Sequence, residues 1–249
     1  MTVALLDTRA VVLDIEGTTT PIAFVYDVLF PFVRAHAMAY LERERGSDAC
    51  RAAVMLLRDD QAADRARGER LPSDLASGDV AQAFEPASIA AYAGWLMDLD
   101  RKSRGLKLLQ GLIWQDGYRS GELRGEVYED VAPALERWRT RGLGTYIFSS
   151  GSVLAQRSLF QTTGAGDLTV LLDGYFDTVI GPKTSADSYR AILKEVGVAP
   201  HLALFVSDAV GELDAAQAAG LRTALCERRA RASVGATSHP VIHTFDELA

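Results

Sequence analysis

Short runs of apolar residues recur along the chain, and segments with a helical pattern separate them. The runs that we interpret as strands cover residues 10–13, 144–148, 178–180, 203–207, 222–226 and 241–244. Strands that are buried on both faces of a sheet read as continuous apolar runs of this length, and helices between them favour parallel pairing. The pattern therefore predicts an α/β fold built on a parallel sheet.

Three helices between these strands have recognisable starts or ends. Ser152 is placed to cap a helix over residues 153–162, and Ser185 is placed to cap a helix over residues 186–196. A shorter helix is expected over residues 212–219. Each of them fits as a crossover between neighbouring parallel strands.

A long segment after the first strand shows almost no strand pattern. It reaches from residue 14 to residue 143 and is far longer than a typical crossover of about a dozen residues. We interpret residues 21–125 as an inserted helical cap, which leaves residues 1–20 and 126–249 as the α/β core. The chain is expected to return to the core in a helix over residues 131–141.

The insertion carries a helical pattern in several places. From Val25 to Leu41 the apolar residues recur at the spacing of one helix face, and Pro31 should kink or restart that helix. Further helical segments cover residues 52–57, 89–99 and 106–114. Residues 65–78, which are rich in Arg, Asp, Gly and Ser, are expected to form a solvated loop.

Composition and charge narrow the class of protein. The 249 residues include 26 Lys and Arg against 33 Asp and Glu, and a net charge of −7 offers no long-range attraction to nucleic acid or anionic lipid. No apolar run approaches the ~18 residues of a membrane span. Cys50 and Cys226 have no metal-ligand or disulfide spacing, and the four histidines show no metal-site spacing. We expect a cytoplasmic protein with free thiols and, without a coiled-coil pattern, a monomer.

Polar residues stand where four of the predicted strands end. Asp14 follows the first strand, Ser149 and Ser150 the second, Lys183 the third and Asp208 the fourth. Because the carboxyl ends of parallel strands lie at one edge of a sheet, these side chains should converge there. Each position alone has an ordinary structural explanation, such as a helix cap or a surface lysine. Four of them in sequence order predict a single site.

The chemistry of these residues suits phosphate ester hydrolysis. An aspartate at such an edge can attack a phosphate when a metal ion and a lysine suppress the charge repulsion, which gives Asp14 and Lys183 their catalytic roles. Glu16 points to the same side of an extended segment and can protonate a leaving oxygen and then activate water. Gly17 permits a tight turn before Thr18–Thr20, whose hydroxyls and amides can bind anionic oxygens.

This set of positions resembles the haloacid dehalogenase-like hydrolase superfamily. Its four motifs are an Asp-x-Asp-like first strand, a Ser or Thr after the second strand, a Lys, and an acidic motif after the fourth. The resemblance implies a Rossmann-like parallel sheet core with an inserted helical cap. Most phosphatases of the superfamily carry Asp where this sequence has Glu16.

Four stretches narrow the resemblance to the enolase-phosphatase family of methionine salvage. They are DIEGTTTPI at 14–22, LQGLIWQDGYRSGEL at 109–123, FSSGS at 148–152 and GPKTSADSYRAI at 181–192. The resemblance implies enolisation and then dephosphorylation of 2,3-diketo-5-methylthiopentyl 1-phosphate, a small-molecule phosphate ester, to 1,2-dihydroxy-3-keto-5-methylthiopentene.

The same resemblance implies one Mg²⁺ ion per chain. The metal ligands would be Asp14, Glu16 and Asp208, and the substrate would be bound by Ser149, Ser150 and Lys183. Mg²⁺ prefers oxygen ligands, and we expect Glu16 to offer its main-chain oxygen so that its carboxylate stays available as acid and base.

Several points stay open at the level of sequence. Glu16 is favoured as the base of the enolisation, although the sequence does not decide between the carboxylates. Glu212 either binds a metal-bound water or orients Lys183, but a carboxylate at a helix start is explained about as well by the helix dipole, so Glu212 and Asp214 are placed outside the main site. Trp114 and Tyr118 either cover the methylthio tail of the substrate or belong to the core of the cap. A general phosphatase, a metal-free dehalogenase and a non-catalytic binding protein are the alternatives.

Overall fold

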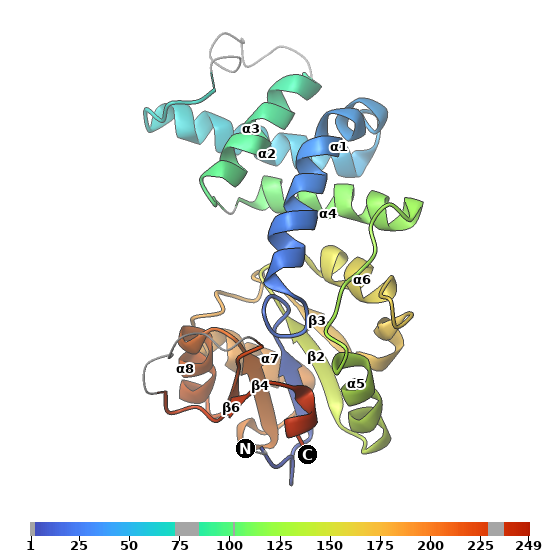
Figure 1. The fold of residues 1–249 in the computed structure, drawn as a ribbon. Helices are drawn as coiled ribbons and strands as arrows, with labels where there is room; N and C mark the ends of the chain where they lie inside the picture. Colours follow the sequence, from blue (N-terminus) through green and yellow to red (C-terminus); the bar gives the residue numbers. More distant parts are fainter. Residues whose placement is uncertain (1–2, 73–84, 102, 229–236) are drawn as a thin grey trace. The chain divides into compact units, whose positions relative to one another are not determined.

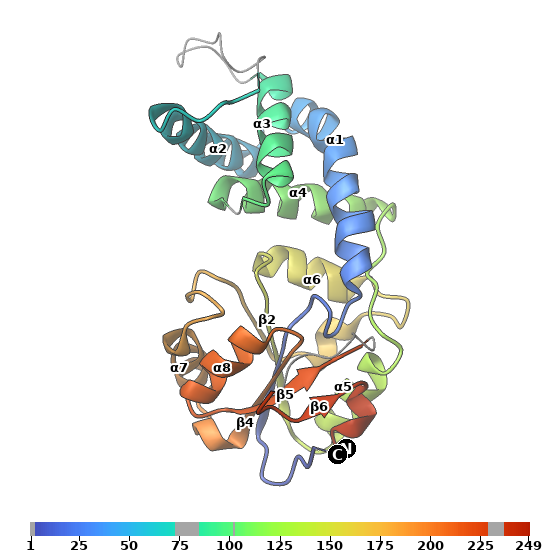
Figure 2. The same cartoon turned by 60° about the vertical axis from the view of Figure 1, so that its left-hand side comes forward.

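The computed structural model describes residues 3–72, 85–101, 103–228 and 237–249 and divides the chain into two compact units. The first unit comprises Met1–Phe24 and Arg124–Ala249, and the second comprises Val25–Leu123. The first unit contains a sheet flanked by helices, and the described part of the second is built from helices (Figures 1 and 2). We call the first the sheet unit and the second the helical unit.

All six strands of the sheet unit run parallel, in the order β3-β2-β1-β4-β5-β6. Their bounds are β1 Ala10–Leu13, β2 Gly144–Phe148, β3 Gly174–Phe176, β4 Ala203–Ser207, β5 Arg222–Cys226 and β6 Val241–Ile242. Strand β1 lies between β2 and β4, and Leu13 aligns with Ile147 and Val206. The parallel α/β fold is confirmed, and the residue after β1 stands in the middle of the carboxyl edge.

Helices cover both faces of this sheet. Their bounds are α5 Val131–Thr140, α6 Val153–Gln161, α7 Ala186–Val196 and α8 Val210–Ala218, with 3-10 turns at Leu168–Leu171, Pro200–Leu202 and Phe245–Glu247. Helices α7 and α8 lie on one side of the sheet, and α5 packs against β2 on the other (Figures 1 and 2).

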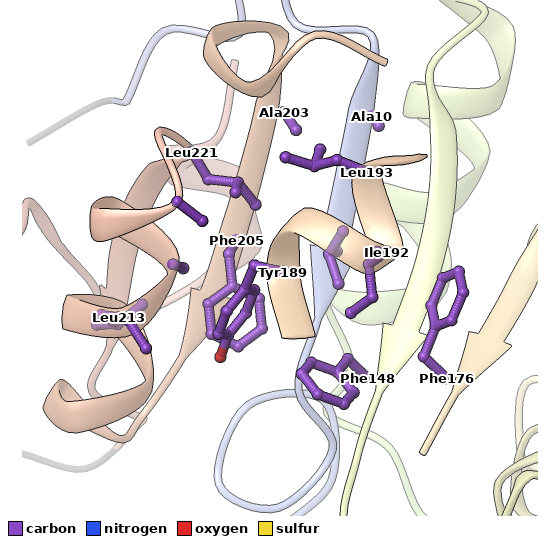
Figure 3. Packing of buried hydrophobic residues seen from close by; sticks show 14 of the residues in the cluster. Ala10, Phe148, Phe176, Tyr189, Ile192, Leu193, Ala203, Phe205, Leu213 and Leu221 are labelled. Atoms are coloured by element: carbon purple, nitrogen blue, oxygen red, sulfur yellow. The ribbon is translucent and has the colours of Figure 1, made fainter. Parts of the chain in front are cut away.

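A buried aromatic cluster fixes α7 against the sheet (Figure 3). The ring of Tyr189 meets Phe148 of β2 edge-on at 5.5 Å and Phe205 of β4 at 5.0 Å between centroids. Ile192 and Leu193 lie in the same cluster and are buried. Because fully burying a side chain of this size stabilises the fold by about 1.5–3 kcal/mol, this packing holds the start of α7 firmly.

The third strand was placed too late in our sequence interpretation. Residues 178–180 form a turn, and β3 is Gly174–Phe176. Asp177 ends the strand, because its carboxylate accepts hydrogen bonds from the amides of Val179 at 2.8 Å and Val153 at 3.3 Å. A side chain that binds the amide two residues later imposes a turn.

Smaller differences concern the ends of elements. Helix α8 begins at Val210, two residues before the predicted start, and β6 ends at Ile242. The hydroxyl of Ser152 accepts the amide of Ala155 at 3.3 Å and caps α6 as predicted. The prediction for Ser185 is wrong, because its side chain forms no capping hydrogen bond at α7.

A π-helix that begins at the boundary of the two units leads into the helical unit, whose described part contains four α-helices. Their bounds are Phe24–Leu29 for the π-helix, then α1 Phe30–Arg43, α2 Asp48–Ala66, α3 Pro86–Asp98 and α4 Arg104–Ser120. Helix α2 packs along α4, and α1 packs against α3. Pro31 lies in the first turn of α1, so the predicted restart of the helix is confirmed.

The expected loop over residues 65–78 begins later than predicted. Helix α2 continues to Ala66, and residues 73–78 lie outside the described residues. The fully buried carboxylate of Asp64 accepts the Tyr92 hydroxyl and Arg101 Nη2, both at 2.6 Å, and these bonds hold the last turn of α2 against α3. Such tertiary contacts stabilise a helix end whose composition suggests a loop.

The cysteines and the absence of a long apolar run were the two compositional features that bear on the fold. Cys50 and Cys226 are buried free thiols, as predicted. None of the described helices has the length and apolar character of a membrane span.

Candidate active site

Asp14 and Lys183 meet at the carboxyl edge of the sheet, although 169 positions separate them in the sequence. Lys183 Nζ lies 2.5 Å from Asp14 Oδ1, and each side chain is only 6% exposed. Asp14 Oδ1 also accepts the amide of Ile15 at 2.7 Å, and Asp14 Oδ2 accepts the Ser207 hydroxyl at 3.1 Å. These three donors hold the carboxylate in one orientation.

Lys183 reaches this position from a loop that α7 secures. The Tyr189 hydroxyl donates to the main-chain oxygen of Lys183 at 2.7 Å, and the Ser188 hydroxyl donates to that of Pro182 at 2.7 Å. Gly181 has φ +140°, and a Cβ atom there would lie 2.3 Å from Ser188 Oγ. The loop therefore holds Lys183 at the edge even though β3 ends seven residues earlier than Lys183.

Glu212, which we had placed outside the site, is part of this cluster. Its Oε2 atom lies 2.7 Å from Lys183 Nζ and accepts the Ser207 hydroxyl at 2.9 Å. Glu212 stands four residues after Asp208, in the first turn of α8, and this spacing from the acidic motif was the available sequence signal. Asp214 does not join the cluster and instead lies 3.1 Å from His239 Nε2.

The charges of the cluster shift the pKa values of its members. Burial opposes the charge of Lys183, but the carboxylates of Asp14 and Glu212 outweigh burial and raise the pKa of Lys183. Burial and the charge of Asp14 raise the pKa of Glu212, while Lys183 and Ser207 oppose that increase. Lys183 is thus a protonated lysine shared between the buried carboxylate of Asp14 and the half-buried carboxylate of Glu212.

Asp208 lies against the turn that follows Asp14. A Cβ atom at Gly17 would be 2.3 Å from Asp208 Oδ2, so the carboxylate rests directly on the backbone of Gly17. The pKa of the buried Cys226 thiol is raised to about 12, mainly by burial, and the charges of Asp208 and Asp14 both contribute to it.

Residues 15–20 form a tightly bonded turn. The amides of Thr18, Thr19 and Thr20 all donate to the main-chain oxygen of Ile15, at 3.2, 3.0 and 2.9 Å, and the amide of Gly17 donates to that of Thr20 at 2.8 Å. The hydroxyls of Thr18 and Thr20 are buried and have no hydrogen-bond partner in the described part of the chain. Glu16 lies at the start of this turn and is half-buried.

Ser149 and Ser150 follow β2, the strand beside β1. The Ser149 hydroxyl is buried and accepts the amide of Gly151 at 3.2 Å, while Ser150 is half-buried. Gln156 Nε2 donates to the main-chain oxygens of Gly151 at 2.8 Å and Phe176 at 2.9 Å, which fixes this loop. The serines lie at the same edge as Asp14, because β1 and β2 are parallel and in register.

Comparison with known proteins decides the family. The family model of the haloacid dehalogenase-like hydrolases matches residues 8–220. The chain belongs to the haloacid dehalogenase-like hydrolases. The resemblance that the four sequence motifs indicated is confirmed.

Individual relatives show to which proteins within this family the chain is similar in sequence. The chain is 48% identical over 236 residues to the enolase-phosphatase E1 of Synechococcus elongatus, with 95% of each chain covered. It is 44% identical over 246 residues to that of Sorangium cellulosum, with 99% of each covered. A crystal structure of the UTR4 protein (Unknown transcript 4 protein) of Saccharomyces cerevisiae matches with a TM-score of 0.73 and 31% identity, over 96% of this chain and 99% of that one. Within the hydrolases, the chain belongs with the enolase-phosphatase E1 proteins.

Enzymes of this family generally use a divalent metal ion, and the residues at the sheet edge fit one. Asp14 and Asp208 offer carboxylate oxygens, and the backbone at Glu16 and Gly17, on which Asp208 rests, offers main-chain oxygens. These are hard oxygen ligands of the kind that Mg²⁺ prefers. No group of three His, Cys, Asp or Glu side chains suited to a metal occurs in the described ranges, and the predicted ligand set needs only two carboxylates.

Trp114 packs inside the helical unit. Its Nε1 donates to the main-chain oxygen of Leu29 at 2.9 Å, and its ring stacks on Phe30 at 6.3 Å between centroids. Tyr118, one turn later on α4, is also buried. These contacts support the alternative in which Trp114 belongs to the core of the helical unit.

Gly17→Ala is expected to weaken binding of a divalent metal ion more than it lowers the stability of the fold. Gly17 has φ +73°, which costs about 1–2 kcal/mol for a residue with a side chain, and the new methyl group would displace Asp208. Urea unfolding and Mg²⁺ titration calorimetry measure the two effects. Gly142→Ala is the matched control, because Gly142 has φ +74° and no atom within 4 Å of the added Cβ. Equal Mg²⁺ affinity in both variants would contradict the prediction.

Proposed function

We propose that this chain converts 2,3-diketo-5-methylthiopentyl 1-phosphate to 1,2-dihydroxy-3-keto-5-methylthiopentene and phosphate in methionine salvage. Full-length similarity to the enolase-phosphatase E1 proteins supports the substrate. The observation that carries the chemistry is the buried contact of Lys183 with both Asp14 and Glu212. The carboxylate of Asp14 and a phosphate dianion repel each other. A cation held beside the carboxylate reduces this repulsion and lets the aspartate attack phosphorus.

In the phosphatase half, Asp14 acts as the nucleophile. One of its carboxylate oxygens forms a bond to phosphorus, and the bond from phosphorus to the substrate oxygen breaks. Lys183 neutralises the charge at the phosphoryl group, and the serines at 149 and 150 bind its oxygens. Glu16 gives its proton to the leaving oxygen and then takes a proton from the water that releases phosphate and restores Asp14.

In the enolase half, the carbon next to a carbonyl group loses a proton to Glu16 and the carbonyl oxygen takes a proton from water, so that Glu16 enters the phosphatase half protonated. Glu16 is the proposed base, because it is half-buried and stands directly before Gly17, on which Asp208 rests. The Lys183 charge lowers the cost of negative charge on the oxygens of the substrate.

The proposal includes one Mg²⁺ ion per chain. The carboxylates of Asp14 and Asp208 and the main-chain oxygen of Glu16 would hold it. When bound, this ion supplies positive charge that stabilises the enolate and phosphoryl oxygens. The proposal also includes a cytoplasmic monomer that acts on a small-molecule phosphate ester and binds neither nucleic acid nor membranes.

The test is an assay on the diketo-phosphate that follows ultraviolet absorbance and phosphate release together. We expect an absorbing enol species to form and phosphate to be released, both only with Mg²⁺, and EDTA should abolish both. A general phosphatase, the nearest alternative, would release phosphate from glycolate or sugar phosphates and leave the ultraviolet spectrum of the diketo-phosphate unchanged. That second outcome would overturn the proposal.

A further inference from the structure

Arg228 occupies a closed environment at the carboxyl end of β5, two residues after Cys226. Its side chain is only 5% exposed, and its Nη1 atom lies 2.5 Å from Asp130 Oδ2. The guanidinium carbon lies 4.4 Å from the ring centroid of Tyr128 and 4.5 Å from that of Phe245. A cation held between two aromatic faces and paired with a carboxylate has little freedom to move.

The Nε donor of this arginine reaches the catalytic turn. Arg228 Nε donates to the main-chain oxygen of Thr18 at 2.8 Å. The neighbouring oxygen of Thr19 accepts the amide of Tyr128 at 3.0 Å. Two successive carbonyls of the turn between Asp14 and Pro21 are therefore bound by groups from far along the chain.

These outside bonds complement the bonds inside the turn. The amides of Thr18 and Thr19 donate to the oxygen of Ile15 inside the turn, whereas the oxygens of Thr18 and Thr19 accept hydrogen bonds from outside the turn. A buried carbonyl oxygen without a donor costs free energy, so these two oxygens need donors from other segments. Arg228 and Tyr128 supply those donors. These donors fix the peptides Thr18–Thr19 and Thr19–Thr20, which directly follow Gly17, the residue against which Asp208 rests.

Asp130 ties the arrangement to a third segment. Its Oδ2 atom also accepts the amide of Phe245 at 2.5 Å, and Arg228 Nη1 donates to the main-chain oxygen of His243 at 3.3 Å. The segment before α5, the end of β5 and the turn at Phe245 thus meet at one guanidinium. Only arginine has a planar fork that serves a carboxylate and two carbonyls at once.

We propose that Arg228, held by Asp130 and the rings of Tyr128 and Phe245, is a positioning residue that clamps the Thr18 carbonyl and thereby sets the geometry of the Asp14–Thr20 turn for metal binding. Its hydrogen bonds go to the carboxylate of Asp130 and to the main-chain oxygens of Thr18 and His243. Its effect passes through the backbone of the turn that carries Glu16 and Gly17. The part of this inference that concerns metal affinity rests on the proposed function.

The test compares Arg228→Lys with Arg222→Lys. Arg222 is the first residue of β5, at the end of the strand away from Arg228, and binds Thr8 Oγ1 at 3.0 Å and the main-chain oxygen of Leu6 at 3.4 Å. Lysine at 228 keeps the charge beside Asp130 but has no fork to hold Thr18 at the same time. Each variant loses an arginine that binds a loop carbonyl, that of Thr18 for Arg228 and that of Leu6 for Arg222. Of these two loops, only the one at Thr18 carries proposed catalytic residues.

Two readouts are measured on the full chain. Calorimetric titration with Mg²⁺ should show a Kd raised about 10- to 100-fold for Arg228→Lys, as is typical when a group that orients a metal ligand is lost. Hydrogen exchange of the metal-free protein should show faster exchange at the amides of residues 17–20 in that variant. Arg222→Lys should match the wild type in both readouts.

The proposal is overturned if Arg228→Lys exchanges at 17–20 like the wild type, or if Arg222→Lys weakens Mg²⁺ binding equally. If Arg228→Lys does not fold, the double variant Arg228→Met with Asp130→Asn removes the buried charge pair and keeps an acceptor for Phe245. A wild-type chain that binds no Mg²⁺ would contradict the proposed function, whereas exchange in the metal-free protein would still test the clamp.

Discussion

Asp14→Asn should abolish phosphate release and leave the fold in place. The variant lacks the nucleophilic oxygen, and loss of a nucleophile typically lowers kcat by about 10⁴-fold or more. Stability should change by no more than about 2 kcal/mol, because Lys183 retains Glu212 at 2.7 Å and is not left as an unpaired buried charge. Steady-state phosphate release and urea unfolding measure these two quantities.

The same variant separates the two half-reactions. If Glu16 is the base of the enolisation, Asp14→Asn should still form the absorbing enol phosphate while releasing no phosphate. Asp187→Asn is the matched control, since Asp187 is 88% exposed on α7 and pairs with Arg190 away from the cluster. Phosphate release by Asp14→Asn at a tenth of the wild-type rate or more would show that another group attacks phosphorus.

Lys183→Met should abolish activity and make stability strongly dependent on pH. Removing one partner of a buried ion pair costs about 3–5 kcal/mol, and here it leaves two carboxylates, Asp14 and Glu212, without their cation. The Ser207 hydroxyl lies within hydrogen-bond distance of both carboxylates, but its single proton serves only one at a time. One carboxyl must therefore take up a proton for the variant to fold well.

The sign of the pH dependence follows from this proton. In the variant the folded pKa of one carboxyl rises above its unfolded value of about 4, so the folded state binds the proton more tightly than the unfolded state. The stability deficit should be small near pH 5 and grow as the pH rises through the raised pKa. In the wild type, the charge of Lys183 opposes the rise in the pKa of Glu212, and the raised pKa of Lys183 keeps it protonated across that range, so the dependence on pH should be weaker than in the variant.

Urea unfolding of the metal-free variants at pH 5 and pH 8 measures the effect. Lys194→Met is the control, because Lys194 is exposed on α7 and its loss should leave stability nearly unchanged at both pH values. A deficit of Lys183→Met that does not depend on pH would mean that the two carboxylates do not share the lysine.

The sheet was predictable from sequence where its strands are continuous apolar runs. Ala10–Leu13 and Ala203–Ser207 were predicted to the residue, because a central strand buried on both faces leaves no room for polar interruption. The strand at Gly174–Phe176 was missed, since three residues at the sheet edge carry too little pattern. Asp177 ends that strand through bonds to Val153, a residue 24 positions away that local pattern does not reveal.

The residues at the sheet edge likewise divide into those that sequence motifs predicted and those that only tertiary contacts revealed. Motif spacing was enough to select Asp14, Lys183 and Asp208, because each belongs to a short motif that can be recognised from its neighbours in the sequence. The role of Glu212 as a second partner of Lys183 was not decided by sequence, since a carboxylate in the first turn of a helix has a sufficient local explanation. Only the approach of α8 to the loop after β3 shows that Glu212 is a partner of Lys183 as well as a carboxylate at a helix start.

By itself, the sequence determined the α/β class, the inserted helical segment and the identity of the acids and the lysine at the strand ends. These properties depend on periodicity and on neighbours within a few residues. The tertiary structure alone decided that Arg228 binds the Thr18 carbonyl and that Glu212 shares Lys183 with Asp14. Such contacts join segments up to 210 positions apart, and their existence depends on how the sheet brings strand ends together rather than on any local pattern.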